Sequence, residues 1–208
     1  MKIQSVRVTA VLAAMTLLAA CSQPASSPPT NAAAKVLKQE SAQQQFFDAL
    51  AQRCGEAFAG KLVSTDATDA DMANQAMVMH ISHCSADEIR IPFNVGENRS
   101  RTWVLTRTGQ GLRLKHDHRH EDGSEDAITQ YGGDTATEGS AIRQEFPVDA
   151  ESIALFTQNN MQVSTTNVWA VEINPALFAY ALRRESRWFR VEFDLTRPIP
   201  TPPPAWGA

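Results

Sequence analysis

The segment from Arg101 to His118 narrows the choice of folds more than any other part of the sequence. Apolar and polar residues alternate on both sides of Gly109-Gln110, as they do in two half-buried antiparallel strands. Glycine at the first loop position favours a two-residue type II′ turn, and such a turn determines which residues face each other. The predicted pairs are Thr108 with Gly111, Leu105 with Leu114, Trp103 with His116, and Arg101 with His118. This register places the apolar residues of both strands on one face, which supports the hairpin.

The same alternation returns in other parts of the chain. It covers residues 77–81, 89–93, 169–173, 178–182 and 189–195, with Pro92 indicating an edge strand or a bulge. A turn at Glu185-Ser186 pairs Leu182 with Phe189, Tyr180 with Val191, and Phe178 with Phe193. Short turns and polar-out alternation predict a mainly β fold of about eight to ten antiparallel strands. We expect a meander β-barrel of lipocalin-like architecture, because closure leaves no unpaired edge, with a β-sandwich as the alternative.

Two segments have the pattern of helices instead. Between residues 40 and 59 the apolar residues recur at helical spacing, and Gly60 follows as a stop signal. These apolar residues are Phe46, Phe47, Leu50, Cys54 and Phe58. A shorter helix is expected over Val148–Phe156, opened by Asp149 as its N-cap.

The first 21 residues have the pattern of an export signal. Lys2 and Arg7 precede an apolar run, Val8–Ala20, that is too short to span a bilayer. The run ends in Leu18-Ala19-Ala20-Cys21, which resembles the cleavage motif of bacterial lipoproteins. That resemblance implies cleavage before Cys21, acylation of the cysteine by fatty acids such as palmitate, and, with Ser22 next, anchoring to the outer membrane with the protein facing the periplasm or the exterior.

The expected domain organisation follows from this leader and from two stretches of low complexity. Residues 1–20 are the signal peptide, and residues 21–39 are the lipidated cysteine with a flexible tether. One β-rich domain occupies residues 40–197, and a Pro-rich tail occupies 198–208. Without residues 1–20, 17 basic and 23 acidic residues leave a net charge of −6. We therefore expect no nucleic-acid partner, and a membrane contact only through the lipid.

Cys54 and Cys84 are the remaining cysteines. An oxidising envelope favours a disulfide between them, which closes a loop of about thirty residues and contributes about 3–4 kcal/mol in the chain-entropy view. A metal site that includes His80 and His83 is one alternative, and two free thiols are the other.

The histidines of Lys115–Glu121 form the densest polar cluster. On an extended strand His116, His118 and His120 point to one face at intervals of about 6.7 Å, a spacing suited to a zinc ion. A second interpretation is an anion or polar-ligand site built from these histidines with Arg99 and Arg101, which the hairpin brings to the same end of the barrel. The third is a solvated cluster, in which Asp117, Arg119 and Glu121 form ion pairs on the other face.

Other polar segments carry weaker signals. Residues 131–135, Tyr-Gly-Gly-Asp-Thr, have the composition of a tight turn. Four arginines near the predicted second hairpin are expected to point outward and to be balanced by acidic neighbours. They are Arg183, Arg184, Arg187 and Arg190.

No motif in the sequence indicates a catalytic nucleophile or a phosphate-binding loop. Residues 90–103 and 114–127 resemble a group of uncharacterised proteobacterial secreted proteins and lipoproteins; the likeness covers most of 46–197 and implies no activity. The sequence therefore favours a non-enzymatic envelope lipoprotein that binds a small ligand or supports the cell envelope. A metal-dependent enzyme or metal-binding protein that uses the histidine strand, and a structural lipoprotein that interacts with another envelope protein, are the alternatives.

Overall fold

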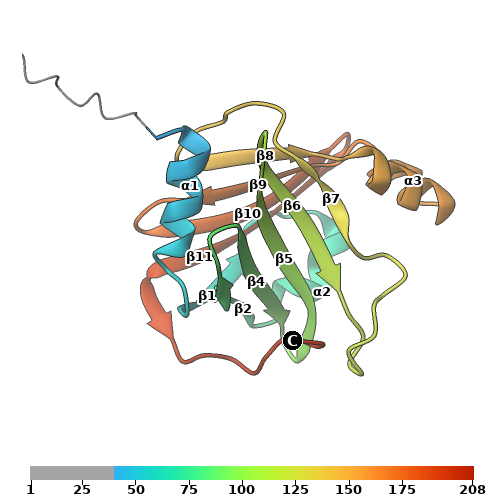
Figure 1. Cartoon of the computed structure of the whole chain (residues 1–208). Helices are drawn as coiled ribbons and strands as arrows, with labels where there is room; N and C mark the ends of the chain where they lie inside the picture. Colours follow the sequence, from blue (N-terminus) through green and yellow to red (C-terminus); the bar gives the residue numbers. More distant parts are fainter. Residues whose placement is uncertain (1–39) are drawn as a thin grey trace, which may run out of the picture. The chain divides into compact units, whose positions relative to one another are not determined.

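Eleven antiparallel strands form the one large sheet of the structure, a computed structural model that describes residues 40–208 (Figure 1). They are β1 (Ala57–Leu62), β2 (Met77–His80), β3 (His83–Cys84), β4 (Glu88–Val95), β5 (Asn98–Thr108), β6 (Gly111–His118), β7 (Tyr131–Asp134), β8 (Arg143–Pro147), β9 (Val168–Ile173), β10 (Leu177–Arg184) and β11 (Arg187–Ile199). The strand order is β7-β6-β5-β4-β2-β1-β11-β10-β9-β8, and β3 pairs with β4 off this path. The predicted signal peptide, Cys21 and the tether lie outside the described residues.

The sheet curves until its two end strands, β7 and β8, meet. The backbone N–H of Asp149, just after β8, donates to the Gly132 carbonyl at 2.9 Å. A side chain at Gly133 would place its Cβ 1.8 Å from the Pro147 carbonyl oxygen, so only glycine permits this approach. The result is a nearly closed barrel, as predicted, and not a sandwich. The segment 131–135, expected to be a tight turn, contains β7.

The predicted hairpin registers are confirmed. In β5–β6, Arg101 faces His118, Trp103 faces His116 and Leu105 faces Leu114. In β10–β11, Tyr180 faces Val191. The turn type in the first hairpin differs, because Gly109 is not among the described glycines with positive φ, which a type II′ turn requires. The alternation of buried side chains therefore determines the register even though the turn differs.

The first helix, α1 (Ala42–Ala51), is shorter than the predicted helix over 40–59. Ser41 caps its start, and its buried residues are Phe46, Phe47 and Leu50. Cys54 lies in the turn that follows, and Phe58 lies in β1. Both residues fit the helical spacing of the sequence, but Cys54 is exposed and bonded to Cys84, and Phe58 is buried by the sheet.

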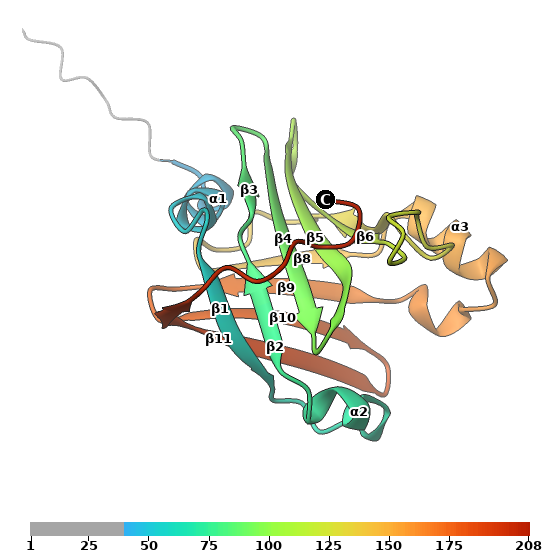
Figure 2. The same ribbon diagram turned by 90° about the horizontal axis from the view of Figure 1, so that it is seen from below.

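Helix α1 covers one end of the barrel, and the second helix lies at the other end (Figure 2). The Arg107 guanidinium, near the end of β5, pairs with Asp48 of α1 at 2.7 Å and lies over the Phe47 ring. At the far end, a short 3-10 helix, η1 (Ala67–Asp69), leads into α2 (Ala70–Ala73) between β1 and β2. The core between these ends is built from the inward-facing residues of the strands.

The last helix, α3 (Ala150–Gln158), agrees closely with the predicted 148–156 segment. The Asp149 side chain accepts a hydrogen bond from the Ser152 N–H at 2.8 Å, which is the predicted N-cap. A 3-10 helix, η2 (Gln162–Ser164), follows before β9.

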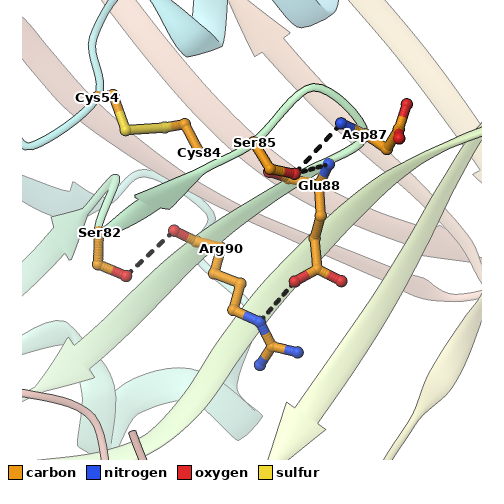
Figure 3. The surroundings of a disulfide bond; sticks show 7 residues. All are labelled: Cys54, Ser82, Cys84, Ser85, Asp87, Glu88 and Arg90. Atoms are coloured by element: carbon orange, nitrogen blue, oxygen red, sulfur yellow. Dashed lines mark hydrogen bonds and ion pairs between the residues drawn. A yellow bond between two sulfur atoms is a disulfide. The ribbon is translucent and has the colours of Figure 1, made fainter.

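The predicted disulfide is present (Figure 3). It joins Cys54, just after α1, to Cys84 of β3, with the two Cα atoms 6.1 Å apart. The turn after Cys84 is held by Ser85, whose Oγ accepts from the N–H groups of Asp87 and Glu88. The disulfide therefore ties the helix at the barrel end to the sheet.

The chain end packs against the barrel. β11 extends to Ile199, two residues into the predicted Pro-rich tail, and the remainder crosses the strands in Figure 2. The Arg99 guanidinium donates to the Pro204 carbonyl at 2.9 Å, and the Trp206 N–H donates to the Arg99 carbonyl at 3.1 Å. Residues 198–208 therefore pack against the barrel.

Candidate ligand-binding site

A cavity of about 170 Å³ lies within the barrel at the end near α2. Six strands contribute to its wall, and η1 and α2 contribute one residue each. The lining residues are Asp69, Met72, Phe93, Arg101, Trp103, His116, His118, Tyr131, Tyr180, Leu182, Arg187 and Phe189. A largely apolar wall with a few convergent polar groups is typical of a site for a small molecule.

The apolar part of the wall is mostly aromatic. The Trp103 ring stacks on Tyr180 with centroids 4.4 Å apart, and Phe93 stacks on Trp103 at 4.8 Å. On the neighbouring strands the His116 ring stacks on Tyr131 at 4.6 Å. Because these rings pack on one another, the flat surfaces that they present are held rigidly.

His116 is held in one neutral form. Its Nδ1 lies 3.0 Å from the Tyr131 carbonyl, which only accepts, so Nδ1 carries the proton. Its Nε2 then accepts from the Tyr180 hydroxyl at 2.7 Å. Burial lowers the pKa of His116 from 6.5 to about 3, with smaller contributions from the charges of His118 and Lys115. This histidine is therefore uncharged at neutral pH.

The histidine and the two tyrosines beside His116 are also neutral. Burial, and then the charge of Arg101, lowers the pKa of His118 to about 4. Its Nε2 lies 3.2 Å from the Tyr131 hydroxyl. Burial raises the pKa of Tyr131 to about 12 and raises the pKa of Tyr180 as well. Two histidines and two tyrosines thus provide hydrogen-bonding groups without charge.

Arg101 provides the charge of the site. Its guanidinium donates to the Asn98 side chain at 3.1 Å, and within residues 40–208 it has no carboxylate partner. Burial lowers the pKa of Arg101, but an arginine remains protonated at neutral pH. The guanidinium is therefore a partly buried cation that faces the cavity without a counter-charge from the described part of the chain.

The second arginine of the wall is neutralised. Arg187 makes two hydrogen bonds of 2.6 Å to Asp69, which is buried, and lies 3.1 Å from Asp66. The hydrogen bonds to Asp69 raise the pKa of Arg187. Arg187, predicted to point outward, therefore joins β11 to the η1–α2 segment at the mouth of the cavity. Arg190, also expected to be balanced by its neighbours, pairs with Glu172 and Glu192.

The structure brings together three of the five predicted ligand-binding residues. Arg101, His116 and His118 line the cavity. Arg99 instead holds the chain end, and His120 is exposed in the loop that follows β6. On the outer face Asp117 pairs with Arg119 and Arg90, but Asp117 is buried, so these pairs do not form the solvated cluster that the third interpretation expected.

The arrangement of three histidines around one zinc ion is not formed. Both ring nitrogens of His116 have protein partners, and His120 lies outside the barrel wall. In the described range 40–208, no group of three or more His, Cys, Asp or Glu side chains has the geometry to hold a metal ion.

The sequence does not predict four residues of the site: Tyr131, Tyr180, Asp69 and Arg187. The strand pattern places Tyr180 on the apolar face, and only the closure of the barrel brings it to His116. Asp69 reaches the site through a connection between strands, where no periodic pattern exists.

A larger groove, of about 1000 Å³, runs over the surface between η2 and the β10–β11 hairpin. It shares Leu182 and Arg187 with the wall of the cavity. Its wall includes exposed side chains such as Val163, whereas the wall of the inner cavity includes the buried groups His116 and Tyr180. The inner cavity, with its buried polar groups, is the better candidate for a specific site.

Compared with known proteins, this chain matches no family model, no curated protein and no solved structure. Within residues 40–208, no helix has the length and apolar character needed to cross a bilayer.

Proposed function

We propose that this chain is an exported, lipid-anchored envelope protein whose barrel binds a small organic molecule. The cavity at the α2 end carries the proposal, since it combines aromatic walls with a few polar groups that converge on one space. The sequence around Cys21 supports the anchor, and the outer membrane is the proposed location.

The anchor is tested by labelling cells with a fatty-acid analogue. We expect the label to be incorporated into the chain, and expect Cys21→Ser to abolish both labelling and membrane attachment. Labelling that persists in the variant, or an unlabelled chain with residues 1–20 still attached, would refute the anchor.

Ligand binding is tested with a panel of small neutral, anionic and cationic aromatic compounds. The full chain is reconstituted in phospholipid nanodiscs, and empty nanodiscs serve as the blank. We expect at least one class to bind and to shift the NMR signals of the Trp103 indole and the His118 imidazole. Leu182→Trp, which fills part of the cavity, should block that binding while circular dichroism shows the fold intact. If no class binds at millimolar concentration, a structural or protein-interaction role replaces ligand binding.

A further inference from the structure

We propose that the ligand of the barrel cavity is a small molecule with a single carboxylate, which pairs with Arg101, and a flat apolar body. This inference rests on the proposed function and specifies its ligand.

The charge of the cavity argues for one negative charge on the ligand. Arg101 is partly buried and has no carboxylate partner within residues 40–208. Taking a cation out of water is costly unless it is paired, so a ligand anion at this place removes an existing penalty. A planar guanidinium and a carboxylate form two parallel hydrogen bonds, which makes the carboxylate the matching group.

The other ionised groups limit the ligand to one such charge. Arg187 is already neutralised by Asp69 and Asp66, so it offers no second cation. A dianion, such as a phosphate monoester, would place its second charge near these two carboxylates without compensation. A cationic ligand would face Arg101 with no free acidic group in the cavity wall to receive it.

The unpaired charge of Arg101 makes the site selective for an acid over its neutral analogue, because the groups beside it are neutral. His116 is already satisfied by Tyr131 and Tyr180, and the Tyr180 hydroxyl proton is engaged by His116. An analogue without a charge would bury the Arg101 guanidinium without pairing it. A site with a buried polar group that the ligand leaves unpaired rejects that ligand strongly.

The strand register gives the orientation of the ligand. Along β5, Arg101 is close to the strand start, Trp103 comes next on the inner face, and Leu105 is further in. The charged head therefore lies near the mouth, and the body points inward against the stacked rings of Trp103 and Tyr180. A volume of about 170 Å³ lined mostly by aromatic side chains admits a body of roughly the size of one substituted aromatic ring.

The test compares three probes of the same shape: benzoate, benzamide and benzylamine. Binding to the full chain in nanodiscs is measured by calorimetry and by NMR. We expect benzoate to bind more tightly than either other probe. Arg101→Gln should weaken benzoate binding by about thirtyfold or more, and should leave benzamide binding unchanged or stronger, because the variant no longer buries an unpaired cation.

Arg183→Gln is the matched control. Arg183 is exposed in the β10–β11 hairpin at the same end of the barrel and does not line the cavity, so the variant loses the same charge. We expect its benzoate affinity to equal that of the unaltered chain. Circular dichroism of both variants establishes that they are folded.

The outcomes separate this inference from the proposed function. If benzamide binds as well as benzoate, or Arg101→Gln and Arg183→Gln have equal effects, the carboxylate assignment is overturned and the ligand-binding function stands. If none of the three probes binds and the wider panel also fails, ligand binding itself is refuted.

Discussion

His116 is a base that the barrel holds in its uncharged state. Only 2 % of its surface is exposed, and its two ring nitrogens are occupied by Tyr131 and Tyr180. The charges nearest to it, on Lys115 and His118 when protonated, also oppose its protonation. Folding is therefore linked to the absence of a proton at this residue.

This linkage predicts acid sensitivity. Unfolded His116 takes up a proton near pH 6.5, whereas folded His116 does so only near pH 3. The unfolded state binds more protons between these values, so the stability is complete above pH 6.5 and is lost as the pH falls toward 3. In His116→Gln, the free energy of unfolding should depend less steeply on pH, by up to about 1.4 kcal/mol per unit, in urea titrations from pH 6.5 to 4.

The control for the acid experiment is His120→Gln, because His120 is exposed in a loop. Its stability should follow pH in parallel with the unaltered chain. Comparing slopes avoids any dependence on the absolute stability of His116→Gln. Parallel curves for His116→Gln and the unaltered chain would contradict the linkage.

At the scale of elements, the seam between β7 and β8 depends on the absence of side chains. A Cβ at Gly133 would lie 1.8 Å from the Pro147 carbonyl oxygen, and backbone atoms cannot move aside without opening the barrel. Gly133→Ala should therefore lower the free energy of unfolding by about 3 kcal/mol, measured by urea denaturation. Gly109→Ala is the control, since no atom lies within 4 Å of its Cβ position, and it should change stability by less than about 0.5 kcal/mol.

Arg187 joins the connection between β1 and β2 to the barrel through two ion pairs, a buried one with Asp69 and a more exposed one with Asp66. Asp69→Asn removes the buried one of the two charges that Arg187 faces, and breaking a buried pair costs about 3–5 kcal/mol. We expect this loss, together with faster amide hydrogen exchange in residues 67–73. Arg113–Asp134 is a matched pair with the same two-bond geometry but an exposed position.

Asp134→Asn is therefore the comparison for the buried pair. Exposed ion pairs contribute about 0–1 kcal/mol, so this variant should differ little from the unaltered chain. Equal effects of the two variants would show that the Arg187–Asp69 pair does not hold the η1–α2 segment in place.

At the scale of the whole molecule, the sequence predicts the residue pairs that form between strands joined by a short turn. Alternation fixes the faces of β5 and β6, so the pairs Arg101–His118 and Trp103–His116 could be predicted without knowing the barrel. Contacts across the cavity between non-neighbouring strands could not be predicted, because they depend on how far the sheet curves. Tyr180, on β10, reaches His116, on β6, only after this closure. The predicted length of the first helix is wrong for a related reason, since Phe58 is buried by the barrel and not by a helix face.

The disulfide acts on the molecule as a whole, because it joins the segment after α1 to the sheet. Its two cysteines are 30 residues apart, and a cross-link of that length stabilises by about 3–4 kcal/mol by restricting the unfolded chain. The double variant Cys54→Ala/Cys84→Ala should lose this amount in urea denaturation and retain the near-ultraviolet circular dichroism of its packed aromatic rings. Adding a reductant should destabilise the unaltered chain similarly and leave the double variant unchanged. A double variant as stable as the oxidised chain would show that the packing of Phe46, Phe47 and Leu50 alone keeps the helix end in place.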